Sequence, residues 1–77
     1  MAGKLPAVDG KRVVRALARA GFVTDRIAGS HHVMVFPGDP TRTVTVPVHA
    51  GRDLKPRTLR SIIRKAGFSV EDFSELL

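Results

Sequence analysis

The pattern of hydrophobic and polar residues near the start of the chain predicts an amphipathic helix. Its apolar positions recur at helical spacing and are Val13, Val14, Leu17 and Ala20. Asp9 is a suitable N-cap before this stripe, and Gly21 is a suitable stop signal after it. We therefore expect a helix over residues 10–20.

Three segments in the middle of the chain have the composition of β-strands. Residues 22–27 show a weak pattern, and a turn at 28–30 separates them from a second, apolar run at 31–36. The next segment, 37–40, contains two prolines and a glycine, so we expect a turn over all four residues.

The third predicted strand has the clearest pattern. Threonine and valine alternate over residues 43–48, which places Val44, Val46 and Val48 on one face of a sheet. Pro47 has no N–H to donate to a neighbouring strand. This strand should therefore end at Pro47 or lie at the edge of the sheet.

A second helix is predicted to follow the loop of residues 49–55. Pro56 suits its first turn, and Gly67 suits its end. The apolar positions that should face the core are Leu59, Ile62, Ile63 and Ala66. Ser69 is then a suitable N-cap for a short third helix. The apolar residues that would anchor this last helix are Phe73, Leu76 and Leu77.

The size and composition of the chain limit its class. Its 77 residues suffice for one α+β domain over residues 1–77, and 43% hydrophobic content is typical of a globular protein. No cysteine is present, which excludes disulfides and thiolate metal sites. The chain has neither the ~18-residue apolar run of a membrane span nor the apolar stretch of a signal peptide. We therefore expect a cytoplasmic protein without membrane contact.

Positive charge is the strongest compositional signal. Thirteen lysines and arginines against seven acidic residues give a net charge of +6. Residues 1–67 hold all thirteen basic residues and four acidic ones, a net of +9, whereas the last ten residues hold three acidic residues and no basic one. The body of the domain therefore favours nucleic acid as a partner, against the alternative of a solvated arginine-rich surface.

Arginines form a stripe on each of the two longer predicted helices. The stripes are Arg12, Arg15 and Arg19 on the first helix, and Arg57, Arg60 and Arg64 on the second. Each is spaced to follow a phosphate backbone, although such stripes are more often plain solvated surface.

Two of the three histidines, His31 and His32, follow a flexible Gly29-Ser30 pair at the start of the second predicted strand. Histidine takes up and gives away a proton near neutral pH. Adjacent residues on a strand point to opposite faces, so these two cannot bind one metal ion together, and His49 would add only one ligand. We therefore expect no metal site.

Cleavage of RNA is the chemistry that needs the least machinery from such a chain. RNA supplies its own nucleophile, the 2′-hydroxyl, so the enzyme has to remove that proton, stabilise the phosphate and protonate the leaving 5′-oxygen. One histidine can serve as base or acid, and a lysine or arginine can hold the phosphate charge. From their charge alone, Lys55 and Arg57 are candidates for the group that works with His31. The competing interpretation of His31 is a strand-edge histidine bonded to the backbone.

Seven short motifs cover nearly the whole chain. They are Leu5-Pro6, Gly10-Lys11, Ala20-Gly21-Phe22, Gly29-Ser30-His31-His32, Val44-Thr45-Val46-Pro47-Val48-His49, Thr58-Leu59-Arg60-Ser61-Ile62 and Ala66-Gly67-Phe68-Ser69. Each is weak alone, but together and in this order they resemble the motifs of the HicA (YcfA-like) toxins. Many members have glycine before the Thr-Leu-Arg motif, where this chain has Pro56-Arg57, and the arginine adds a candidate phosphate contact.

The resemblance implies a fold and an activity. The fold is like a double-stranded-RNA-binding domain: a three-stranded antiparallel sheet with helices on one face. The activity is that of a metal-independent mRNA interferase, the toxin of a type II toxin–antitoxin pair, whose HicB-type antitoxin occludes the active site. No cofactor is expected. The catalytic histidine of the family follows the Gly-Ser pair, which is His31 here; members with an intervening residue would point to His32 instead.

Ten residues are expected to contact the RNA. They are Ser30, His32, His49, Lys55, Arg12, Arg15, Arg19, Arg57, Arg60 and Arg64. Two other classes stay open from the residues themselves. One is a non-catalytic RNA-binding module that reads the shape of a duplex, and the other is an interaction domain whose main role is to bind a partner protein.

Overall fold

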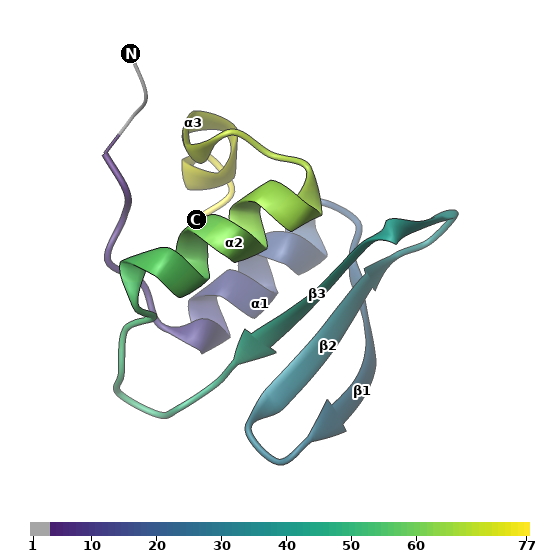
Figure 1. The fold of residues 1–77 in the computed structure, drawn as a ribbon, viewed down its shortest axis with the longest axis horizontal. Coiled ribbons are helices and arrows are strands. Elements are labelled where there is room, and N and C mark those ends of the chain that lie inside the picture. The colour runs from purple at the N-terminus through teal and green to yellow at the C-terminus, as the bar shows by residue number, and fades with distance from the viewer. Residues whose placement is uncertain (1–3) are drawn as a thin grey trace.

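The computed structural model describes residues 4–77 and has the predicted order of elements (Figure 1). The helices are α1 (Gly10–Arg19), α2 (Pro56–Ala66) and α3 (Val70–Ser74), and the strands are β1 (Val23–Ala28), β2 (His31–Phe36) and β3 (Asp39–Pro47). The fold is therefore α+β, with a three-stranded antiparallel sheet and a short C-terminal helix, as the sequence predicted.

The sheet has the strand order β1-β2-β3, and both neighbouring pairs are antiparallel. α1 and α2 pack on one face of β2 and β3, where Met34, Val44 and Val46 are buried with the apolar sides of the helices. β1 is exposed along its whole length. One face of the sheet is therefore covered by helices and the other is open.

The boundaries of α1 agree with the prediction. The Asp9 side chain accepts a hydrogen bond from the Arg12 N–H at 2.9 Å, which satisfies a donor that the first helical turn leaves free. Val13 and Leu17 are buried as expected, and Ala16, outside the predicted stripe, is buried with them.

α2 also begins and ends where the sequence predicted, and α3 begins after Ser69 as predicted but ends at Ser74, before Leu76 and Leu77. Gly67 ends α2 in the left-handed conformation with φ of 90°, which glycine adopts without a steric penalty. The four predicted core positions of α2 are all buried. The Ser69 hydroxyl accepts the Asp72 N–H at 3.0 Å at the start of α3, and Phe73 is buried.

β3 is longer than predicted, because it begins at Asp39 rather than at residue 43. The turn contains only Pro37 and Gly38, so the expected four-residue turn was wrong. Pro40 lies within β3 because β3 is at the edge of the sheet, where a residue without an N–H is tolerated. The strand ends at Pro47, as predicted.

Arg42 joins β3 to the C-terminal end of α2. Its Nε donates a hydrogen bond to the Ala66 carbonyl oxygen at 2.7 Å. Its guanidinium carbon lies 4.1 Å from the ring centroid of Phe36, and the rings of Phe22 and Phe68 are also within cation–π distance. The positive charge of Arg42 therefore lies at the negative, C-terminal end of α2, and the planar guanidinium group packs against aromatic rings.

Gly10 brings the start of α1 against the end of β3. A Cβ atom at this position would overlap the carbonyl oxygen of Pro47 and would lie 2.9 Å from the Val48 Cα. Since the neighbours are backbone atoms, they cannot move aside without shifting β3. Glycine therefore permits the two segments to approach this closely.

We predict that Gly10→Ala destabilises the protein by about 2 kcal/mol or more, because the added methyl overpacks against backbone atoms. Urea unfolding of the purified variant measures this loss. The control is Lys11→Ala, the next and exposed position of α1, which should change the free energy of unfolding by at most about 0.5 kcal/mol. Equal stability of the two variants would contradict the close contact.

We further predict that Arg42→Met costs about 2 kcal/mol of unfolding free energy, because it removes a charged hydrogen bond and the cation–π contacts but keeps most of the volume. Thermal and urea unfolding give the value. Arg26→Met is the matched control, since the Arg26 side chain is 70% exposed and pairs only weakly with Asp25. A loss of the same size in Arg26→Met would show that Arg42 acts through net charge alone.

Candidate functional site

His31 is the first residue of β2 and is exposed to solvent. The Gly29–Ser30 turn that precedes it is made possible by the positive φ of Gly29. The sheet register pairs His31 with Ala28 on β1 and with Pro47 on β3. The imidazole is therefore on the central strand, directly beside the last residue of the edge strand.

The two adjacent histidines have different surroundings. His32 pairs with Val46, which is fully buried under the helices, and His32 itself is half-buried. Because neighbouring strand residues alternate between faces, His31 lies on the open face and His32 on the helix-covered face. The two side chains are therefore not placed to act together on one ligand atom.

The turn before His31 is tied to the end of β3. The Val48 N–H donates a hydrogen bond to the Ser30 carbonyl oxygen at 2.7 Å. This bond continues the β2–β3 ladder by one step beyond Pro47. The backbone on both sides of His31 is therefore fixed relative to β3.

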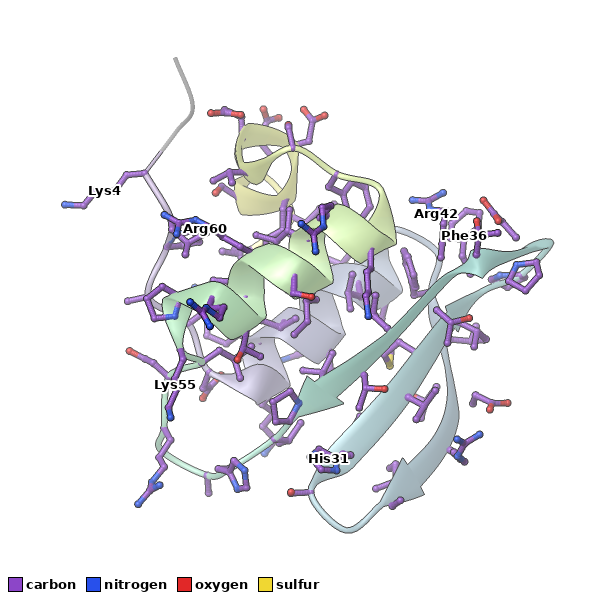
Figure 2. All side chains as sticks on the ribbon, viewed as in Figure 1. Lys4, His31, Phe36, Arg42, Lys55 and Arg60 are labelled. Carbon is purple, nitrogen blue, oxygen red and sulfur yellow. The ribbon has the colours of Figure 1, made fainter. Side chains whose placement is uncertain are left out.

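A basic cleft of about 390 Å³ begins where β3 ends. It is lined by Pro47, His49, Arg52, Asp53, Leu54, Lys55 and Thr58. Pro47 also pairs with His31 across the sheet, so the cleft begins at the cross-strand neighbour of His31, although His31 itself does not line it. Figure 2 shows His31 and Lys55 toward the end of the molecule where β3 finishes, away from Arg42 and Phe36.

The loop that forms this cleft is held by backbone contacts. The Leu54 N–H donates to the Val8 carbonyl oxygen at 2.8 Å, and Asp53 forms a bridge with Asp9 just before α1. Within the loop, the Arg52 N–H donates to the His49 carbonyl oxygen at 3.1 Å. The chain before α1 therefore positions the residues that precede α2.

The predicted RNA-contacting arginines do not gather at one place. Arg12, Arg15 and Arg19 line a separate cleft of about 190 Å³ with Leu77, and Arg19 Nη1 donates to the Leu76 carbonyl oxygen at 2.6 Å. The α1 stripe thus lies against the C-terminal segment. Among residues 4–77, none of these three arginines lines the cleft beside Pro47.

The α2 arginines are also divided. Arg57 lines a groove together with Lys65, whereas Arg60 lines a different cleft that includes Lys4. Figure 2 labels Arg60 on α2 and Lys4 on the segment before α1. Arg64 is exposed on the last turn of α2. Of the ten predicted RNA contacts, Ser30 and His32 are the chain neighbours of His31, and His49 and Lys55 line the cleft that begins at Pro47.

The sequence prediction did not include three cations that line these clefts, Lys4, Arg52 and Lys65. The spacing of Lys65 carried a signal, because it follows Arg57 and Ser61 at intervals of four residues and so shares their side of a helix. Arg52 lies in a loop and has no such periodic pattern.

Among residues 4–77, no cluster of three or more His, Asp or Glu side chains has the arrangement to hold a metal ion. No helix in the same part of the chain is long and apolar enough to cross a membrane.

The fold defines a small, strongly basic α+β domain in which an exposed histidine pairs across the sheet with Pro47, where a cleft lined by Arg52 and Lys55 begins. A family model described as the HicA toxin of bacterial toxin–antitoxin systems matches residues 10–68. The chain therefore belongs to the HicA toxin family, and membership of a toxin–antitoxin family implies an antitoxin partner. No curated protein matches the chain closely enough to count as a relative.

Proposed function

We propose that this protein is a metal-independent endoribonuclease that cleaves mRNA in the cytoplasm and thereby arrests translation. The observation that carries the proposal is the position of His31, an exposed imidazole paired across the sheet with the residue where the basic cleft begins. The membership of the HicA toxin family supports the same class of activity.

The proposed reaction needs one proton acceptor, one proton donor and a positive charge near the phosphate. The 2′-oxygen attacks the adjacent phosphorus as it loses its proton, and the bond from phosphorus to the 5′-oxygen breaks. The products are a 2′,3′-cyclic phosphate and a 5′-hydroxyl, which receives a proton. His31 exchanges one of these protons, and Lys55 lies in the cleft where it balances the phosphate charge.

His31 is the better candidate for the catalytic histidine because of its exposure. An acid–base group has to come within hydrogen-bond distance of the substrate atom whose proton it moves. His31 lies on the open face, whereas His32 is half-buried opposite Val46. Access to RNA therefore favours His31 over His32 as the catalytic residue. We propose that His32 contacts the RNA only through the exposed part of its side chain.

The remaining predicted contacts fall into two groups by position. Ser30, His49, Lys55 and Arg57 lie around or next to the cleft and are proposed to touch the RNA close to the cleaved bond. The more distant group is proposed to draw the strand in by long-range attraction and consists of Arg12, Arg15, Arg19, Arg60 and Arg64.

We further propose that the antitoxin is of the HicB type and that it neutralises the toxin by covering His31. The imidazole is exposed at the end of the sheet, so a protein that occupies the open face there would block the cleft beside Pro47.

The central test compares His31→Ala with His32→Gln in an RNA cleavage assay with EDTA present. Loss of an acid–base group should lower the cleavage rate about 100-fold or more in His31→Ala, with less than about tenfold loss in His32→Gln. Circular dichroism and melting temperature check that both variants fold.

The other outcomes have definite meanings. Full activity of His31→Ala together with loss in His32→Gln would move the catalytic role by one residue. RNA binding without cleavage by the unaltered protein would replace the proposal with a non-catalytic RNA-binding module. Loss of activity in EDTA, restored by added metal, would contradict the metal-independent mechanism.

A further inference from the structure

A second groove, about 290 Å³ in volume, runs between α2 and β3. It is lined by Val44, Thr45, Arg57, Thr58, Ser61, Ile62 and Lys65. Two of these side chains are cationic and three have hydroxyl groups, and the lining contributed by residues 4–77 includes no carboxylate. The groove therefore offers charge and hydrogen-bond donors to an anion along its length.

The polar residues of α2 are arranged in a row. Arg57, Ser61 and Lys65 are separated by four residues each, so they lie one above the other on the helix surface. The row from Arg57 to Lys65 is about 12 Å long at the helical rise of 1.5 Å per residue. That is the length of about three or four stacked nucleotides of one strand.

The groove opens into the cleft beside Pro47. Thr58, on the first turns of α2, lines both of them. A strand that lies in the groove is therefore led past Thr58 toward Lys55, and from there to Pro47 and its cross-strand neighbour His31. The two concave surfaces meet at Thr58 and together form a track whose lining, within residues 4–77, holds four cations, Arg52, Lys55, Arg57 and Lys65, and one carboxylate, Asp53.

The two walls of the track are held at both ends. Arg42 attaches β3 to the last turn of α2, and the Val8–Leu54 hydrogen bond ties the loop before α2 to the chain before α1, where Gly10 lies against the end of β3. The positions of Arg57 and Lys65 relative to β3 are therefore set by the fold itself, and binding need not order a loop to form this part of the track.

The lining is better suited to a sugar–phosphate backbone than to a polypeptide. A docked peptide usually fills apolar pockets with its side chains. The apolar residues here, Val44 and Ile62, are already 98% and 96% buried in the core, since only 2% and 4% of their surface is exposed. Little apolar surface remains for a peptide, whereas the cations and hydroxyls match phosphate oxygens.

We propose that this groove is an extended RNA-backbone site, in which Arg57 and Lys65 each bind a phosphate and Ser61 donates to the strand between them. The inference rests on the proposed function for the identity of the ligand as RNA. It adds a direction, since the strand leaves the cleavage site along α2 and not along the arginine stripe of α1.

The experiment measures the affinity of the purified protein for a fluorescently labelled single-stranded 2′-O-methyl RNA, which cannot be cleaved because its 2′-oxygen is blocked. The variants are Lys65→Ala and Arg57→Ala. The matched comparison is Arg64→Ala, which removes one charge from the neighbouring position of the same helix turn but lies outside the groove lining. The melting temperature of each variant should stay unchanged, because all three side chains are exposed.

Each groove variant should bind the strand about three- to tenfold more weakly, and the slope of log affinity against log salt should fall by about 0.7 per lost phosphate contact. Arg64→Ala should weaken binding by about twofold or less, since it changes only the screened long-range field. An equal loss of RNA affinity in Arg64→Ala and Lys65→Ala, or no loss in Lys65→Ala, would contradict the proposal that the groove binds RNA. Lys65-dependent binding of polyglutamate in place of RNA would overturn it in favour of an acidic protein partner.

The result is separate from that of the cleavage assay. Groove-dependent RNA binding by a protein that does not cleave would support the groove and contradict the nuclease. Cleavage by the unaltered protein, together with RNA binding that does not change in Lys65→Ala, would support the nuclease and contradict the RNA-binding role of the groove.

Discussion

The close backbone contact between Gly10 and the end of β3 is the constraint on which the candidate site depends. It places the start of α1 directly on Pro47 and Val48, where the strand gives way to the loop that precedes α2. The same short stretch of chain holds that loop through the Val8–Leu54 hydrogen bond. Three segments that are far apart in the sequence therefore meet at one corner, and His31 is joined to that corner by its pairing with Pro47. The Gly10 contact and these backbone bonds together fix the backbone of His31, the cleft and the start of α2 relative to one another.

Arg42 plays a comparable role at the other end of the sheet. A guanidinium packed among three aromatic rings and bonded to the Ala66 carbonyl oxygen fixes β3 against the last turn of α2. The two contacts leave the middle of the β3–α2 boundary free for the groove with Arg57 and Lys65. In a domain this small, few residues remain to form a deep pocket once the core is built. Concave surface at the boundary between two fixed elements is the form of binding site that the fold can supply, and a long polyanion is a ligand that such a surface suits.

Local patterns in the sequence were enough to predict the elements, whereas the site depended on contacts between them. Helical spacing and caps gave both ends of α2, since Pro56 and Gly67 act within a single turn. The start of β3 was misplaced because Pro40 favours a turn locally, and only its location on an edge strand makes it acceptable. The opposite orientations of His31 and His32 followed from the alternation of a strand. The cleft did not, because it requires the long-range bond between Val8 and Leu54, and nothing near Arg52 in the sequence indicates that this side chain lines a cleft.

The chemistry proposed for the corner is consistent with what so small a domain can provide. Most hydrolytic enzymes position a nucleophile, a base and an oxyanion site together, which takes several elements and a buried pocket. RNA brings its own nucleophile one bond away from the phosphate, so the protein has only to place a proton-transfer group and positive charge beside a bound strand. In the proposed reaction, His31 on its strand serves the first requirement, and the cations that follow Pro47, on a loop tied to the chain before α1, serve the second. The arginines of α1 lie near the C-terminal segment, away from the cleft beside Pro47. In the proposal they attract the RNA from a distance, which accelerates its association with the protein but does not determine which phosphate reaches His31.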